Sequence, residues 1–237
     1  MILIALDTCA ALGSVSVLRD QDTLSVTAHQ TSEDYSVWLL PAVEKVLAAA
    51  GQTMADIDAY AVAGGPGSFT GVRVSLTTVK AWAEVYRRPI VSMSRLEALA
   101  TLSTTTEPFI AAFTDAHRQQ VFGALYRRKE GELQRVGEEM VIAPEKFVAW
   151  SAEKAGTDRV HWISTEPRCI TQTNAWATRQ QTNETIETVD PILAPAIGRL
   201  GHQLALRNRF TDALSLDANY VRRSDAEIFW KNGSKLA

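Results

Sequence analysis

One stretch of this 237-residue chain, residues 61–75 (AVAGGPGSFTGVRVS), places the segment GGPGS, residues 64–68, between two apolar runs. The glycines allow backbone angles that other residues resist, and we expect Gly67 to need such a conformation. Pro66 fixes its own φ, which favours a tight turn. The turn precedes a predicted helix over 70–86, whose free N-terminal N–H groups suit an anion. Spacing alone leaves two interpretations open, a purely structural turn or an anion-binding loop.

The glycine spacing excludes three well-known loops. A P-loop requires G-x-x-x-x-G-K-[ST], but Gly71 is not followed by lysine, and the next lysine is Lys80. The dinucleotide-binding pattern G-x-G-x-x-G fails because Thr70 stands where its third glycine belongs. A G-x-S-x-G nucleophile elbow fails because Pro66 stands two residues before Ser68.

Histidine and cysteine are not spaced as metal ligands. The four histidines are His29, His117, His161 and His202. No two of them have the i, i+4 spacing of an H-x-x-x-H site. Cys9 and Cys169 form no C-x-x-C motif, which favours two free thiols in a reducing compartment. We therefore expect no metal and no cofactor.

The predicted strands recur along the chain. Apolar runs at 2–6, 13–18 and 23–30 predict three strands, and runs at 109–113, 121–126 and 133–142 predict three more. Asp7 closes the first run of one copy, and Asp115 closes the first run of the other. This repeat indicates an internal duplication. A duplicated βββαβα unit is the architecture of the actin-like ATPase (sugar kinase) fold, so we predict an α/β protein of two lobes, 1–107 and 108–237.

The turns after these aspartates are poor phosphate sites. In actin-like kinases, glycines after the aspartate let backbone N–H groups approach the phosphates. Here glycine arrives only at Gly13 in the first copy, and residues 115–120 of the second copy contain none. We expect a degenerate nucleotide cleft, in which Asp7 and Asp115 cap turns at strand ends.

Two helices carry more apolar surface than one sheet needs. Apolar residues of the 38–50 helix, for which Ser32 is a plausible N-cap, cover an arc of roughly 200°, whereas a surface helix needs a stripe of about 100°. The 70–86 helix has two opposite apolar faces, one of them containing Val74, and Trp82 lies between the two. Either both faces are buried within one large domain, or one face binds another protein.

Composition limits the possible classes of protein. The net charge of −3 and a pI near 5.8 argue against independent binding to nucleic acid. No apolar run reaches the ~18–20 residues of a membrane span. The apolar opening, MILIALDTCAALG, has no basic residue ahead of it, unlike a signal peptide. We expect a cytoplasmic protein with a mobile tail at 228–237.

The segment GGPGSFTGVR resembles the signature of the TsaB (YeaZ) family, bacterial proteins needed to make threonylcarbamoyladenosine (t6A) in tRNA. Four further segments are similar to that family: ILIALDT at 2–8, LLPAVEKVL at 39–47, FTDAHRQQVFGALY at 113–126 and ANYVRRSDAE at 218–227. Their order and spacing extend the resemblance over nearly the whole chain.

This resemblance implies a noncatalytic subunit that binds and activates the transferase TsaD, helps to recruit the ATPase TsaE, and meets tRNA only through the complex. It also implies a possible homodimer in isolation. The signature loop would comprise Gly65, Pro66, Gly67, Ser68, Phe69, Thr70, Gly71 and Arg73. The partner interface would include Trp38, Val46, Ala49, Val74, Thr78 and Trp82. A stand-alone actin-like ATPase or kinase and a glycoprotease-like peptidase are the alternatives.

Overall fold

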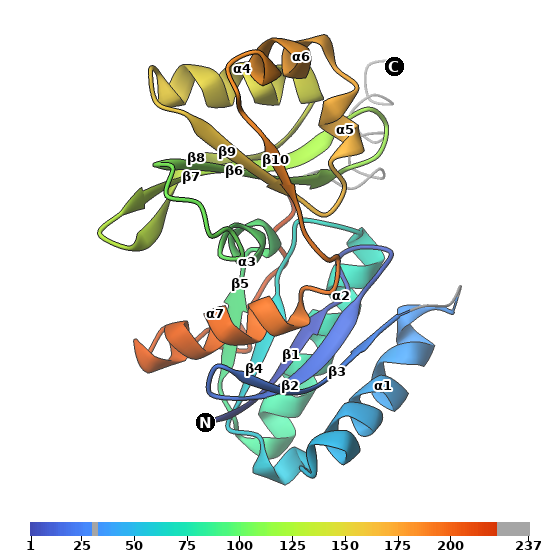
Figure 1. The fold of residues 1–237 in the computed structure, drawn as a ribbon. Helices are drawn as coiled ribbons and strands as arrows, with labels where there is room; N and C mark the ends of the chain where they lie inside the picture. Colours follow the sequence, from blue (N-terminus) through green and yellow to red (C-terminus); the bar gives the residue numbers. More distant parts are fainter. Residues whose placement is uncertain (30–32, 222–237) are drawn as a thin grey trace, which may run out of the picture.

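Two β-sheets, one above the other in Figure 1, organise the chain. The computed structural model describes residues 1–29 and 33–221. Ser32, proposed as a helix cap, and the tail at 228–237 lie outside the described residues.

The first sheet has the strand order β3-β2-β1-β4-β5. Its strands are β1 (Ile2–Asp7), β2 (Ser14–Arg19), β3 (Asp22–Ala28), β4 (Ala59–Ala63) and β5 (Ile90–Met93). β1, β2 and β3 form an antiparallel meander, and β4 and β5 add in parallel on the other side of β1. Leu3 of β1 lies opposite Leu18 of β2 and Ala59 of β4. Because both faces are covered by helices, β4 is buried along its whole length.

The second sheet repeats this arrangement in the order β10-β9-β6-β7-β8. Its strands are β6 (Phe109–Asp115), β7 (Val121–Lys129), β8 (Glu132–Ile142), β9 (Val160–Ser164) and β10 (Ile186–Thr188). β6, β7 and β8 are antiparallel, and β9 and β10 add in parallel beside β6. The predicted duplication and the actin-like α/β fold class are confirmed.

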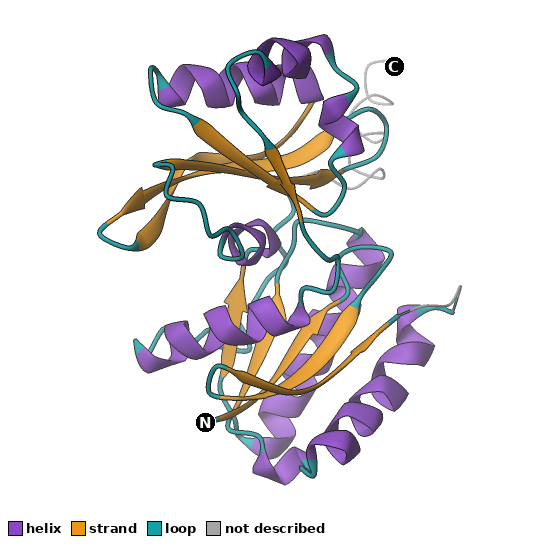
Figure 2. Cartoon of the chain, viewed as in Figure 1, coloured by secondary structure: helices purple, strands orange, loops and turns teal. Residues whose placement is uncertain are grey.

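Helices cover the faces of both sheets (Figures 1 and 2). The helices are α1 (Tyr35–Ala50), the 3₁₀ turn η1 (Met54–Asp56), α2 (Phe69–Tyr86), α3 (Arg95–Ala100), α4 (Pro144–Ala155), α5 (Arg168–Thr171), α6 (Asn174–Gln180) and α7 (Ala194–Leu206). α1 and α2 lie on one face of the first sheet, and α7 lies on the opposite face. α4 and α6 cover the outer face of the second sheet, and α3 lies on its inner face.

The two lobes exchange their last helices. α3 follows β5 of the first sheet but packs on β6, β7 and β9. α7 follows β10 of the second sheet but packs on β1, β2, β4 and β5. Gly198 and Gly201 allow α7 to approach closely, since a Cβ there would lie 2.2 Å from a methyl carbon of Leu18 and 2.7 Å from the Cβ of Ala61. The proposed boundary between residues 107 and 108 lies between the strands of the two sheets, and both α3 and α7 pack across it.

Capping residues determine where α3 begins and where α1 ends. Ser94 Oγ accepts hydrogen bonds from the N–H groups of Leu96 (3.1 Å) and Glu97 (3.3 Å) and caps α3. Gly51, with φ of 62°, ends α1 in the left-handed conformation. α1 begins after Asp34, whose side chain makes no capping hydrogen bond.

Candidate functional site

The predicted signature loop connects β4 to α2 and rests on the end of β1. The N–H of Ser68 donates to the Cys9 carbonyl over 2.7 Å, and Thr8 Oγ1 donates to the Gly71 carbonyl over 2.6 Å. Ser68 also caps α2 by accepting from the N–H of Gly71 at 3.3 Å. The Gly65–Pro66 peptide bond is cis. These contacts make the loop and the first hairpin one unit.

The glycines of this loop have two different roles. Gly65 has φ of 113°, a conformation that side chains rarely adopt. Gly67 has no positive φ, so the expectation that it needs a special backbone conformation is wrong. Its role is close approach, because a Cβ there would lie 2.1 Å from the Cys9 carbonyl oxygen. A Cβ on Gly71 would lie 2.0 Å from the Thr8 carbonyl oxygen.

The C-terminal segment returns to this loop from a distance in sequence. The N–H of Asn219 donates to the Gly64 carbonyl over 2.7 Å. Arg73 Nε donates to the Tyr220 hydroxyl over 2.7 Å, and the Arg73 guanidinium carbon lies 3.7 Å from the centre of the Phe69 ring. The structure therefore joins the GGPGSFTGVR segment to residues 218–221 of the C-terminal motif.

A buried ion pair lies beneath the loop. Asp7 is fully buried and accepts a hydrogen bond from Arg95 Nε at 2.9 Å. The other carboxylate oxygen of Asp7 accepts from the N–H of Cys9 at 2.9 Å, which is the turn-capping role that we expected. Burial is the largest single influence and lowers the pKa of Arg95, but the charge and hydrogen bond of Asp7, together with Cys9 and Glu166, raise this pKa above its usual value.

The sequence analysis missed Arg95 because the two partners are 88 residues apart and no motif links them. Its only sequence signal is its place directly after Ser94, because serine is a residue type that commonly caps helices.

In the turn that follows Asp115, backbone N–H groups already donate hydrogen bonds within the turn. The N–H of His117 donates to Asp115 Oδ1 at 2.7 Å, that of Ala116 to the Gln120 carbonyl at 2.9 Å, and that of Gln120 to the His117 carbonyl at 3.0 Å. His117, Arg118 and Gln119 have φ of 58°, 53° and 59° without any glycine. The backbone therefore adopts a glycine-like conformation here, yet three of its donors are already engaged. This supports the expected loss of the second phosphate site.

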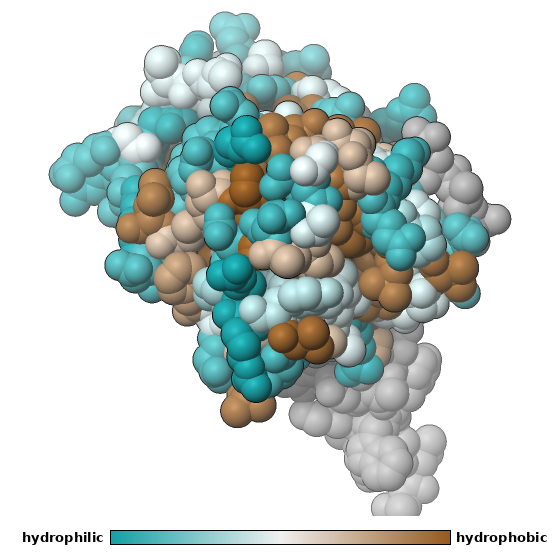
Figure 3. Space-filling view, turned by 90° about the horizontal axis from the view of Figure 1, so that it is seen from below, coloured by the Kyte–Doolittle hydropathy of each residue, from teal (hydrophilic) through white to brown (hydrophobic). Residues whose placement is uncertain are grey.

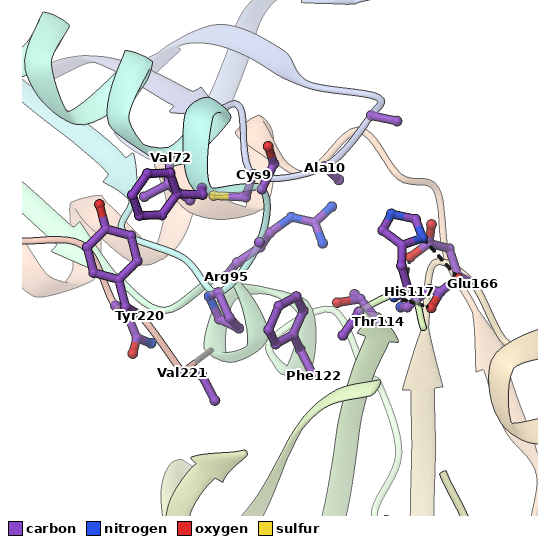
Figure 4. A pocket seen from close by; sticks show the side chains of 18 of the residues that line it. Cys9, Ala10, Val72, Arg95, Thr114, His117, Phe122, Glu166, Tyr220 and Val221 are labelled. Atoms are coloured by element: carbon purple, nitrogen blue, oxygen red, sulfur yellow. Dashed lines mark hydrogen bonds and ion pairs between the residues drawn. The ribbon is translucent and has the colours of Figure 1, made fainter. Parts of the chain in front are cut away.

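A cavity of about 740 Å³ separates the two hairpins (Figure 4). Cys9 and Ala10 line it from the first lobe, and Asp115 and Phe122 line it from the second. Burial and then the negative charge of Asp7 raise the pKa of the Cys9 thiol well above its usual value. Because the thiolate is the nucleophilic form, Cys9 is a poor nucleophile.

Within residues 1–29 and 33–221, no group of three or more His, Cys, Asp or Glu side chains is arranged to hold a metal ion. None of the helices formed by these same residues is both long and apolar enough to cross a membrane.

A second hollow, of about 460 Å³, runs between α1 and α2. Leu39 and Leu40 line it from α1, and Phe69, Val74 and Thr78 line it from α2. We call it the α1–α2 groove. Leu40 is 54% exposed. Figure 3, which views the molecule from below, shows that apolar side chains interrupt the polar surface in several places on that face.

The residues predicted for a partner interface are exposed to different degrees. Ala49 is exposed, and Trp38, Val74, Thr78 and Trp82 are partly exposed. Val46 is only 1% exposed, and its carbonyl accepts a hydrogen bond from Ser25 Oγ at 2.6 Å. Val46 is thus a core residue, because this side of α1 packs against β3.

Trp82 contributes to the core as well as to the surface. Its ring centre lies 5.5 Å from that of Tyr60, a fully buried residue of β4. Truncation of Trp82 would therefore remove core contacts in addition to any contact with a partner.

The chain is similar to proteins and structures of known family. The family model described as "TsaD: tRNA N6-adenosine threonylcarbamoyltransferase" matches residues 24–185. The tRNA threonylcarbamoyladenosine biosynthesis protein TsaB of Bacillus subtilis is 33% identical over 57% of this chain and 59% of its own length. The protein of the same name from Haemophilus influenzae is 27% identical over 97% of this chain and 95% of its own length.

A solved structure extends this similarity to three dimensions. It is an uncharacterised Pseudomonas aeruginosa protein with similarity to peptidase YeaZ, and it aligns with a TM-score of 0.74 at 26% identity. The alignment covers 93% of this chain and 99% of that one. In the curated matches, this chain spans less than two thirds of the B. subtilis protein and of its Escherichia coli counterpart, 59% and 64% of their lengths. Since the family match covers well over half of the 237 residues, the chain belongs to the TsaD-type threonylcarbamoyltransferase family and, by its named relatives, to the TsaB (YeaZ) group within it.

Proposed function

We propose that this chain is a noncatalytic cytoplasmic subunit of t6A synthesis that binds a TsaD-type transferase and holds it in an active arrangement. The observation that carries this proposal is the α1–α2 groove, an apolar hollow beside the signature loop that residues 1–29 and 33–221 leave uncovered.

The groove has the chemistry of a helix-binding surface. Leu39 and Leu40 line it on α1, and Leu40 is 54% exposed. On α2, Val74 and Thr78 line it, and Val85, which is 72% exposed, continues the same side of the helix. Contiguous apolar side chains between polar ones are typical of a site that a partner covers.

A TsaD-type partner fits the shared family and the names of the relatives. The net charge of −3 supports a subunit that meets tRNA through its partner rather than alone. The proposed recruitment of TsaE depends on the family resemblance and on no contact described above.

Replacing Leu40 with glutamate is expected to weaken binding to the TsaD of the same genome by at least ~10-fold, equivalent to about 1.4 kcal/mol. The added carboxylate would have to be buried in an apolar contact. Isothermal titration calorimetry of the two purified proteins measures the change. The matched control is Leu206→Glu on α7, where the leucine is 67% exposed and far from the groove.

Equal affinity of the Leu40→Glu and Leu206→Glu variants would contradict the assignment of the groove to TsaD. Sedimentation of the chain alone addresses the possible homodimer. If two copies associate through the groove, Leu40→Glu should shift the chain to a monomer and Leu206→Glu should not.

The rival functions, a stand-alone ATPase or kinase and a peptidase, predict turnover by the isolated chain. We expect none with Mg-ATP or with peptide substrates, because the donors of the second turn are engaged and the described residues contain no metal-ligand cluster. A coupled phosphate-release assay and a casein digest measure these activities. Steady release of phosphate that increases with enzyme concentration would favour the ATPase instead.

A further inference from the structure

We infer that the cavity between the lobes is a binding site for a small organic monocarboxylate with an aromatic or aliphatic body. This inference does not depend on the proposed role of the α1–α2 groove. The cavity of about 740 Å³ lies within the ~300–1,000 Å³ that is typical of small-molecule sites.

Arg95 supplies the anchor for the carboxylate. Its side chain is only 3% exposed, and its guanidinium points into the cavity (Figure 4). Nε is held by Asp7 at 2.9 Å, whereas Nη2 is buried with no hydrogen-bond partner among the described residues. A buried donor without a partner costs free energy, and an ionised carboxylate is one of the acceptors that a guanidinium binds strongly.

Positive and negative side chains are balanced around the cavity, which leaves no excess of positive charge for a polyanion. The arginines of its wall are Arg73, Arg95 and Arg118, and the acidic groups are Asp115 and Glu166 of the wall with Asp7 behind Arg95. Asp7 already neutralises much of the charge of Arg95 from behind. Asp115 and Glu166 line the opposite wall, and Glu166 Oε2 accepts from the N–H of Asp115 at 3.1 Å. A polyphosphate would bring several negative charges toward these two carboxylates, whereas a monocarboxylate needs only Arg95.

The rest of the cavity wall is suited to the aromatic or aliphatic part of such a ligand. Ala10, Pro66, Phe69, Val72 and Phe122 line the cavity between the charged groups. Phe69 packs against the ring of Tyr220, with the ring centres 5.1 Å apart, so this part of the wall is preformed. Apolar walls with a small number of fixed polar or charged groups are the usual composition of a small-molecule site.

The test uses 2-naphthoate, 2-naphthamide and ATP as probes of the full-length chain. We expect 2-naphthoate to bind with a Kd below ~1 mM and the uncharged amide to bind at least ~10-fold more weakly. ATP should bind more weakly than 2-naphthoate. Saturation-transfer NMR with titration at pH 7 measures all three affinities under one set of conditions.

Two variants locate the site. Ala10→Phe should fill the cavity and weaken 2-naphthoate binding at least ~10-fold, whereas Ala55→Phe, on an exposed turn outside the cavity, should leave it unchanged. Arg95→Lys keeps a positive charge beside Asp7 but removes the Nη groups, and it should weaken naphthoate binding without affecting the amide. Thermal melting confirms that each variant is folded.

Three results would overturn the inference. These are equal affinity for the acid and the amide, unchanged naphthoate binding by folded Ala10→Phe, and tighter binding of ATP than of 2-naphthoate. The last result would assign the cavity to a polyphosphate. None of them bears on TsaD binding by the Leu40→Glu variant, so this inference and the proposed function fail separately.

Discussion

Arg95→Gln is expected to lower the free energy of unfolding by about 3–5 kcal/mol, because it leaves the Asp7 carboxylate buried without its counter-charge. Asp7 is fully buried and the Arg95 side chain is 3% exposed, so both partners of this ion pair are buried in the fold. Urea denaturation followed by circular dichroism measures the change. The matched control is Arg87→Gln, which breaks an ion pair to Glu84 in which the arginine is 82% exposed. Exposed pairs contribute only about 0–1 kcal/mol.

A second variant separates the loss of the pair from the loss of packing. Asp7→Asn combined with Arg95→Gln removes both charges and should recover part of the stability that Arg95→Gln loses. If Arg95→Gln costs no more than Arg87→Gln, the ion pair does not stabilise the fold.

Gly67→Ala is expected to cost about 3 kcal/mol, since the new methyl group would overlap the Cys9 carbonyl oxygen at 2.1 Å. That oxygen is held by the N–H of Ser68, so relief requires the loop and the first hairpin to move apart. Thermal and urea unfolding measure the loss. The control is Gly51→Ala at the end of α1, where φ is 62° and no atom lies within 4 Å of the added Cβ.

The control should cost only about 1 kcal/mol, which is the strain of a positive φ in a residue with a side chain. A larger loss for Gly51→Ala than for Gly67→Ala would show that backbone conformation, not the close approach to Cys9, determines the cost in this chain.

Local sequence patterns predicted most of the fold. Apolar runs predicted the three antiparallel strands at the start of each sheet, β1–β3 and β6–β8, because these signals act over a few residues. The duplication was visible because both copies repeat the same order of strands. The exchange of α3 and α7 was not visible, because an amphipathic helix does not encode which sheet it covers.

The site was only partly predictable for the same reason. The signature loop was located from its glycines. The reason why Gly67 has no room for a side chain is the nearby Cys9 carbonyl, which belongs to the turn after β1 and could not be placed from the sequence. Arg95 and Asp7 meet only after both β1 and α3 have packed. Val46 was named for the partner interface from the family resemblance, and a resemblance does not show how much of α1 the neighbouring strand β3 covers.

The exchange of helices also sets the order in which the chain can mature on the ribosome. Domains usually fold from the N-terminus as they are synthesised. Here the inner face of the first sheet stays bare until α7, at Ala194–Leu206, has left the exit tunnel. Strands made first must therefore wait for a helix made near the end, with Leu18 and Ala61 exposed to solvent or to a chaperone in the meantime. Nascent chains arrested before residue 194 should be cleaved by protease faster than chains that include α7, although both contain all five strands of the first sheet.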